Sequence, residues 1–231
     1  MKKIKIVKAI LAIALAAPLA FAKPNATKPQ ALVSVDAESA LKELKSGNQR
    51  FLTGKVRTDG LNATDIRRLS TGQSPNSIML SCSDSRIPPE AVFDQKLGEM
   101  FTVRSAGESL SPQGIGSLEY AIEKLGSHLL VVLGHTNCGA VKAAVETLGG
   151  SSHGSDNLDK LVQDIHPRIK SAVKNNMASK DLKDEAWANA RGIAKDLLSR
   201  SKLISAAAAS GRVKIVVGLY DLSSGAVEFE R

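Results

Sequence analysis

Two short apolar runs, each followed at once by polar residues, constrain the fold of this 231-residue chain more than any other feature. Residues 77–81 (SIMLS) lead into Cys82, and residues 128–134 contain the run LLVVL and lead into His135. Runs of this kind, without polar alternation, are typical of parallel strands that are buried on both faces. Residues 117–126 carry apolar side chains at helical spacing, so the pattern predicts a strand, a helix and a second, parallel strand in succession.

The rest of the pattern extends this unit to one α/β domain, because the chain length suits a single core rather than two. Residues 213–220 form a third apolar run, and the turn at 223–225 would return residues 226–229 as an antiparallel edge strand. Further helices are expected over residues 38–52, 63–71, 140–148, 158–176 and 182–209. We therefore predict a mostly parallel central sheet flanked by helices, with a C-terminal antiparallel edge strand, in a single domain over residues 38–231.

The first 22 residues have the composition of an export signal. Four lysines precede an apolar run over residues 9–22, which closes with the A-x-A pattern AFA. The run is 14 residues long, whereas a membrane-spanning helix needs roughly 20. We therefore expect a signal peptide over 1–22 and a flexible leader over 23–37. The mature protein would be periplasmic or secreted, with no stable membrane span after signal cleavage.

The charge balance gives little support to nucleic-acid binding. The whole chain carries a net charge of +8, and removal of the four signal-peptide lysines leaves +4. Aromatic residues make up only 3% of the sequence, and no basic block is interleaved with them. Because nucleic-acid binders commonly combine a basic surface with stacking aromatic rings, no nucleic-acid partner is expected.

The two cysteines, Cys82 and Cys138, allow two interpretations. One is a disulfide, because compartments beyond the cytoplasmic membrane are oxidising. The other is a metal site, since His135 stands three positions before Cys138 and directly after a predicted strand. Cys82 follows a second predicted strand, and the carboxyl ends of parallel strands meet at one edge of a sheet. The neighbouring residues favour the metal site, with Cys82, His135 and Cys138 as its ligands.

These three candidate ligands indicate a catalytic zinc centre. Two cysteines and one histidine leave one position of tetrahedral Zn²⁺ open for water, which is the pattern of catalytic zinc. Zinc lowers the pKa of that water to about 7 and so provides hydroxide near neutral pH. Asp84 and Arg86 follow Cys82 by two and four residues. We expect Arg86 to hold the Asp84 carboxylate off the metal, where Asp84 accepts a hydrogen bond from the zinc-bound hydroxide.

The two motifs together resemble those of the β-class carbonic anhydrases. CSDSR at residues 82–86 and HTNCGA at residues 135–140 match the family pattern CxDxR and HxxC. Other similar segments are residues 40–51, 72–75, 114–120 and 218–221, so the resemblance covers residues 38–231. It implies the β-carbonic-anhydrase fold, one Zn²⁺ per chain, and reversible hydration of carbon dioxide to bicarbonate and a proton by a zinc-bound hydroxide. It also implies a homodimer or homotetramer.

The resemblance further implies the substrate contacts. It places Phe101 and Tyr120 at an apolar wall for carbon dioxide, and Gln73 as a donor that reaches the substrate oxygen across a dimer interface. The backbone N–H of Gly139 would be another donor to that oxygen. These four residues are the candidate substrate-binding set.

The chain also departs from the family in ways that bear on the site. Members with an inhibitory bicarbonate pocket carry Trp three positions before the first cysteine and Gly directly before it, whereas this chain has Met79 and Ser81. We therefore predict the plant-type arrangement, in which Asp84 is paired with Arg86 and lies off the zinc at neutral pH. Residues 104–108 read RSAGE where the family usually has RNAGN, so the resemblance does not define the hydrogen bonds of this segment.

Two other functions stay open at this point. Related proteins use the same kind of zinc site to hydrolyse carbonyl sulfide or carbon disulfide, which are linear analogues of carbon dioxide. A non-catalytic zinc-binding protein is the other alternative, although metal storage needs neither Asp84 nor Arg86. Measurement of hydration and of sulfide release side by side separates these functions.

Overall fold

The computed structural model describes residues 35–152, 154–174 and 177–230. The signal peptide predicted over 1–22 lies outside these residues, as does most of the leader predicted over 23–37. Helix α1 begins at Ala37, where the side chain of Asp36 accepts hydrogen bonds from the N–H groups of Glu38 and Ser39. This cap fixes the start of the helix that the sequence predicted over 38–52.

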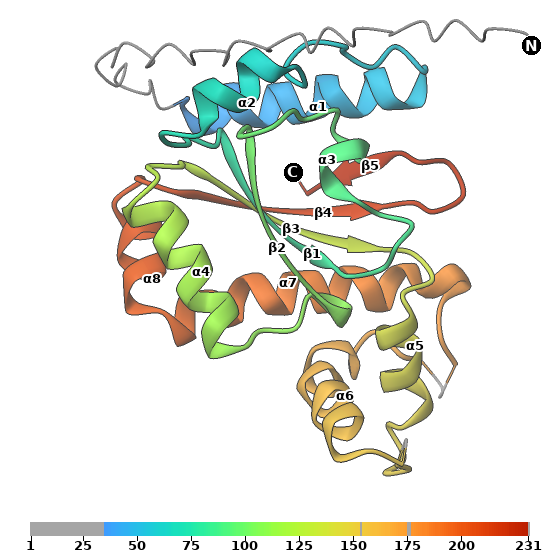
Figure 1. Cartoon of the computed structure of the whole chain (residues 1–231). Coiled ribbons are helices and arrows are strands. Elements are labelled where there is room, and N and C mark those ends of the chain that lie inside the picture. The colour runs from blue at the N-terminus through green and yellow to red at the C-terminus, as the bar shows by residue number, and fades with distance from the viewer. Residues whose placement is uncertain (1–34, 153, 175–176, 231) are drawn as a thin grey trace, which may run out of the picture. The chain divides into compact units, whose positions relative to one another are not determined.

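Five strands form one sheet in the order β2-β1-β3-β4-β5 (Figure 1). The first four pair in parallel and β5 pairs with β4 in the antiparallel sense, which confirms the predicted fold class. Every residue of β1 and β3 is buried, as expected of central parallel strands. The strands are β1 (Ser77–Cys82), β2 (Met100–Ser105), β3 (Leu129–His135), β4 (Lys214–Tyr220) and β5 (Val227–Phe229).

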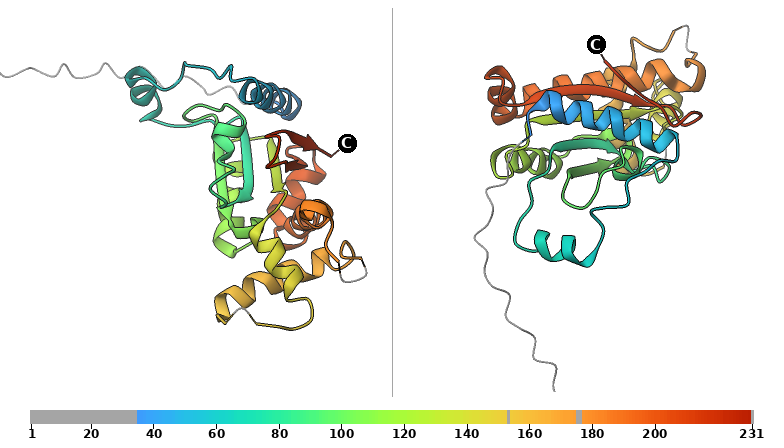
Figure 2. Two further views of the ribbon diagram at one scale, coloured as in Figure 1. Left: turned by 90° about the vertical axis from the view of Figure 1, so that its right-hand side faces the viewer. Right: turned by 90° about the horizontal axis from the view of Figure 1, so that it is seen from above.

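Helices cover both faces of the sheet. Alternate strand residues divide the core, so that Met79 and Val131 belong to one apolar cluster and Ile78 and Leu130 to the other. Helix α1 packs in the first cluster and α4, α7 and α8 in the second, on opposite sides of the sheet, while α5 and α6 lie beyond the carboxyl ends of the strands (Figures 1 and 2). The α-helices are α1 (Ala37–Leu52), α2 (Ala63–Leu69), α3 (Pro89–Val92), α4 (Pro112–Glu123), α5 (Gly139–Glu146), α6 (Asp156–Ile169), α7 (Lys183–Arg200) and α8 (Lys202–Ala209). Among the described residues, no helix combines the length and apolar character that crossing a bilayer requires.

The predicted helix over 182–209 is two helices. Ser201 has an extended backbone (φ −127°, ψ 108°), and its side-chain oxygen accepts a hydrogen bond of 3.0 Å from the N–H of Ile204. Ser201 therefore ends α7 and caps α8. The apolar spacing continues through the break, so the periodicity alone did not reveal it.

The predicted helix over 158–176 ends earlier, at Ile169. Pro167 lies in its last turn and has no N–H to donate to the carbonyl four residues before it. The chain turns at once, with the N–H of Ala172 bonded to the oxygen of Ile169 at 2.8 Å. The sequence had placed the end of this helix too late.

Two further boundaries differ from the sequence prediction. The helix predicted over 117–126 is α4, which begins at Pro112 because the Ser111 side chain accepts a hydrogen bond from the N–H of Gly114. Strand β2 was not predicted at all. It is an edge strand whose residues are only partly buried, and Arg104 interrupts its apolar pattern.

Candidate metal centre

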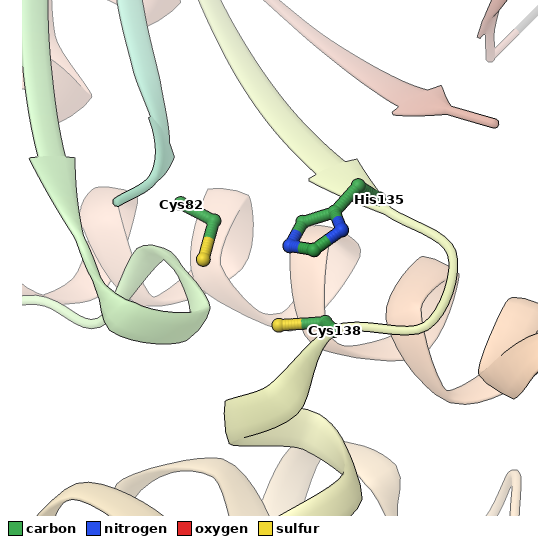
Figure 3. A group of neighbouring side chains, drawn as sticks. All are labelled: Cys82, His135 and Cys138. Carbon is green, nitrogen blue, oxygen red and sulfur yellow. The ribbon is translucent and has the colours of Figure 1, made fainter. Parts of the chain in front are cut away.

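The ends of β1 and β3 bring the candidate ligands together. The two strands are parallel neighbours with Ser81 opposite Leu133, so Cys82, the last residue of β1, and His135, the last of β3, emerge at the same edge of the sheet. Cys138 follows three residues later as the N-terminal cap of α5. The side chains of these three residues point toward one common space (Figure 3).

Their geometry fits a metal ion. One ligand atom from each of Cys82, His135 and Cys138 lies within 4.8 Å of the other two, and all three residues are buried. Both cysteines are free thiols in the described part of the chain, so the geometry follows the metal interpretation and not the disulfide. Two sulfurs and one imidazole nitrogen form a donor set that suits Zn²⁺.

His135 presents the correct nitrogen. Its Nδ1 lies 2.9 Å from the backbone oxygen of Thr136, and only a protonated Nδ1 can bond to a carbonyl. The lone pair is then on Nε2, which is buried and has no hydrogen-bond partner within the described residues. A metal ion would satisfy this otherwise orphaned atom.

Two backbone hydrogen bonds hold the loop between His135 and Cys138 in place. The N–H of Thr136 donates to the oxygen of Tyr220 at 3.0 Å, which joins the loop to β4. The N–H of Asn137, a residue with a left-handed backbone (φ 52°), donates to the oxygen of Asp181 at 2.7 Å. The positions of both ligands are therefore fixed by backbone hydrogen bonds from other elements.

The two thiols have opposite pKa shifts. A hydrogen bond from the Cys138 thiol lowers the pKa of Cys82 to about 4, and the N–H of Gly107 acts in the same direction. The same hydrogen bond and burial raise the pKa of Cys138 well above its usual range. A bound cation would favour the thiolate form of both cysteines.

Asp84 and Arg86 form the expected pair beside the ligands. Arg86 donates from Nε to Oδ1 of Asp84 at 2.9 Å and from Nη2 to Oδ2 at 2.7 Å. This forked hydrogen bond holds the pKa of Asp84 well below its usual range, so the carboxylate is ionised at neutral pH. Its Oδ2 lies 4.0 Å from Nε2 of His135, close to the common space of the ligands.

The sequence analysis gave no role to Arg104, although it holds the Cys82 loop. Its guanidinium donates to the backbone oxygens of Cys82 at 2.9 Å and of Asp84 at 2.7 Å. The only sequence signal was a charged residue in the RSAGE segment, and its partners follow from the unpredicted pairing of β2 with β1.

The turn after β2 also contacts the site. The N–H of Gly107 donates to the sulfur of Cys82 at 3.4 Å, and the next residue, Glu108, is buried. Burial raises the pKa of the Glu108 carboxyl group well above its usual range, and the negative charge of Cys82 adds to this effect. Burial thus disfavours the charged form of this carboxyl group.

The four substrate-binding candidates do not all lie at this centre within one chain. The rings of Phe101 and Tyr120 are in contact, with centroids 6.4 Å apart. Phe101 nevertheless lies four residues before Ser105, which pairs with Cys82, and four residues of strand span about 13 Å.

The other two candidates differ in position. Gln73 is exposed in the connection between α2 and β1, whereas Gly139 directly follows Cys138 at the start of α5. Within a single chain, only Gly139 of the four is held next to a metal ligand.

A buried Cys₂His set at the carboxyl edge of a parallel sheet, beside an arginine-held carboxylate, defines an α/β protein with a catalytic type of metal site. The family model for carbonic anhydrase matches residues 77–227, which include all three candidate ligands. The chain is 33% identical over 187 residues to carbonic anhydrase 2 of Mycobacterium tuberculosis, covering 81% of this chain and 89% of that protein. It is 35% identical over 190 residues to a carbonic anhydrase of Mycolicibacterium smegmatis, covering 82% and 91%.

Comparison with solved structures extends this result to the fold. This chain superposes with a TM-score of 0.62, at 20% identity, on a solved structure from the fungus Sordaria macrospora. That structure belongs to a study of two tetrameric β-carbonic anhydrases of this filamentous ascomycete. The match covers 83% of this chain and 96% of the other. The chain therefore belongs to the carbonic anhydrase family, an enzyme family of the lyase class, and it has the fold of the β class. The resemblance inferred from the sequence is confirmed.

Proposed function

We propose that this protein catalyses reversible hydration of carbon dioxide to bicarbonate and a proton, with one Zn²⁺ per chain held by Cys82, His135 and Cys138. The observation that carries the proposal is the convergence of three buried ligand atoms within 4.8 Å, one of them an imidazole nitrogen with no partner among the described residues. Membership of the carbonic anhydrase family supports this reaction over hydrolysis of carbonyl sulfide or carbon disulfide. When bound, zinc supplies the Lewis acidity that makes water a nucleophile near neutral pH.

Asp84 and Arg86 are proposed to orient the reacting water. An ionised carboxylate only accepts hydrogen bonds, so Asp84 accepts from the water and aims its lone pair at the carbon of carbon dioxide. Arg86 keeps the carboxylate in place through its forked hydrogen bond. The retention of both residues argues against a site that merely stores metal.

Gln73, Phe101 and Tyr120 are proposed to act at the site of a second copy of the chain. Phe101 is too far along β2 to reach the metal ligands of its own chain, so a homodimer or homotetramer would be needed to place an apolar wall beside the site. The tetrameric state of the similar Sordaria proteins supports this assembly. Gly139, which follows Cys138 directly, would offer its N–H to the substrate oxygen in its own chain.

Export is a separate proposal that rests on the sequence. Residues 1–22 would be cleaved as a signal peptide, and the mature protein would act in the periplasm or outside the cell. The mass of the protein purified from the periplasmic fraction tests this, because the cleaved chain would begin at Lys23.

Substitution of the metal ligands tests the main proposal. We expect Cys82→Ser and His135→Gln to lose stoichiometric zinc and carbon dioxide hydration together, because each removes one of three protein ligands. His166→Gln is the matched control, since His166 bonds to Thr147 at 3.0 Å and lies outside the ligand set. Zinc is measured by elemental analysis, and hydration by stopped-flow with a pH indicator. The proposal would be contradicted if Cys82→Ser kept its full zinc content. It would also be contradicted if the parent protein released sulfide from carbonyl sulfide but did not hydrate carbon dioxide.

A further inference from the structure

Two buried polar side chains, Glu108 and Asn189, lie behind the metal ligands and have no part in the chemistry proposed so far. Glu108 is 1% exposed and Asn189 is fully buried. Each also has one oxygen, Oε1 and Oδ1 respectively, without a hydrogen-bond partner in the part of the chain that the structure describes. An unsatisfied buried polar atom typically costs about 1–3 kcal/mol. Their presence in an otherwise apolar core therefore calls for a physical reason.

Asn189 holds the turn after β2 at two points. From α7, its amide nitrogen donates to the backbone oxygen of Gly107 at 2.9 Å and to Oε2 of Glu108 at 3.0 Å. The turn itself is unusual, because Gly107 (φ 61°) and Glu108 (φ 53°) both have a left-handed backbone. That conformation costs a non-glycine residue roughly 1–2 kcal/mol, so the turn needs support from outside.

The same turn carries the N–H group that donates to the sulfur of Cys82 at 3.4 Å. Gly107 is required there, because a Cβ atom would lie 2.8 Å from Cδ1 of Ile165 and 3.0 Å from Cβ of Ala140. A hydrogen bond to the sulfur orients this ligand atom toward the metal site. Asn189 thus bonds to the carbonyl of Gly107, the same residue whose N–H donates to a candidate metal ligand.

We propose that Asn189, acting through Glu108 and Gly107, is a positioning residue that holds the Cys82 sulfur in place and so sets the metal affinity of the site. This inference rests on the proposed metal site and deepens it. Asn189 contacts neither substrate nor metal in this role. It acts through Gly107, because it bonds to the carbonyl of this residue while the N–H of the same residue donates to the sulfur. Glu108, the glutamate of the RSAGE segment, takes part in the same hydrogen-bond network, since its carboxyl group accepts the second hydrogen bond of Asn189.

The test compares Asn189→Leu with a matched control, Asn48→Leu. Asn48 is also buried, at 3% exposed, and its amide donates to two backbone oxygens, those of Val92 at 3.1 Å and Gly225 at 3.0 Å. It has no link to Cys82. Each variant loses a buried asparagine whose amide nitrogen donates two hydrogen bonds, so the pair separates a general loss of stability from a specific effect on the metal ligand.

The readouts are zinc affinity, measured by competition with a chelator, and the thiolate-to-cobalt charge-transfer absorption of the Co²⁺-substituted protein. For Asn189→Leu we expect zinc affinity to fall by roughly 10–100-fold, the usual effect of losing an outer partner of a metal ligand. We also expect the charge-transfer band to shift. Asn48→Leu should have a lower melting temperature but the zinc affinity and absorption band of the parent protein.

Asn189→Ser is measured in parallel, because it keeps one hydrogen-bond donor. It tests the positioning role of Asn189 if the leucine variant does not fold. Its zinc affinity is expected between those of the parent protein and Asn189→Leu. Parent-like affinity and absorption in whichever Asn189 variants fold, or equal changes in the Asn48 control, would overturn the inference. Failure of the parent protein to bind Zn²⁺ or Co²⁺ would instead overturn the proposed metal site, so the two failures are distinguishable.

Discussion

At the scale of single residues, the centre depends on which atom of each side chain is left free. His135 has Nδ1 engaged by the oxygen of Thr136, which leaves Nε2 for a ligand. Asp84 has both carboxylate oxygens engaged by Arg86, yet each oxygen can accept a further hydrogen bond. Local hydrogen bonds between near neighbours in sequence thus prepare the site before any metal or substrate is bound.

The orienting role of Asp84 leads to the first prediction. Asp84→Asn should retain zinc, because Asp84 is not among the three ligands, but slow hydration by roughly 10²–10⁴-fold, the usual contribution of a positioned proton acceptor. The loss arises because an amide can donate to the water as well as accept from it. Zinc content and stopped-flow hydration are measured on the same sample. Activity at the parent level would remove Asp84 from the mechanism.

At the scale of elements, a buried carboxylate joins α1 to the loop after α3. Asp94 is 3% exposed and accepts hydrogen bonds from Arg50 on α1 at 2.6 Å and from Lys96 at 2.9 Å. The backbone N–H of Arg57, in the connection between α1 and α2, also donates to it. Asp94 thereby fixes the start of the segment that contains α2 and Gln73.

The pKa of Asp94 leads to a prediction for acid stability. Burial raises the pKa of Asp94, but the hydrogen bonds from Arg50, Lys96 and Arg57 outweigh it and lower the pKa to about 2. An unfolded aspartate has a pKa of about 3.9, so this stabilisation is fully present above about pH 4 and is lost as the pH falls toward 2.

Asp94→Asn should lower the free energy of unfolding at pH 7 by roughly 3 kcal/mol, because it leaves the partly buried cations of Arg50 and Lys96 without a negative counter-charge. Asparagine suits the left-handed backbone of this position (φ 48°), so the change tests charge and not conformation. Urea unfolding at pH 7 and pH 3 measures the difference, which should shrink at the lower pH. Asp59→Asn is the control, since the Asp59 side chain is 72% exposed. Equal effects of the two substitutions would contradict the role given to Asp94.

At the scale of the whole molecule, one helix buries none of its residues against the rest of the described chain. Helix α2 has no buried residue, and it projects from the body of the domain in both views of Figure 2. Leu61 and Ile66 in this segment are each 57% exposed. Gln73 follows α2 directly in the chain. A second copy that covers this apolar surface would also bring Gln73 and the Phe101–Tyr120 pair toward another metal centre.

Ile66→Asp should therefore yield smaller assemblies, because a charge would be placed in the proposed contact. Zinc should be retained, while hydration falls by on the order of 10²-fold through misplacement of the substrate-binding residues. Sedimentation velocity, zinc content and hydration are measured together. Leu158→Asp is the control, since Leu158 is 49% exposed on α6, away from this surface. An unchanged assembly, or a fully active monomer, would count against the shared site.

Local patterns in the sequence were enough to predict the fold class, the two strand ends and the three candidate metal ligands, because a buried parallel strand and the motif that follows it are both local. They also predicted the Asp84–Arg86 pair, whose members are two residues apart. The sequence analysis missed the break between α7 and α8 at Ser201, ended α6 too late and began α4 too late, because helix boundaries depend on capping serines and on proline as well as on apolar periodicity.

Only the tertiary structure revealed what supports the ligands. Arg104 reaches the Cys82 loop through the pairing of an edge strand that has no clear apolar pattern. Asn189 bonds to Gly107 across 82 residues of sequence, and no local spacing relates the two. Contacts of this kind depend on how α7 packs against the sheet, and packing is a property of the folded chain as a whole.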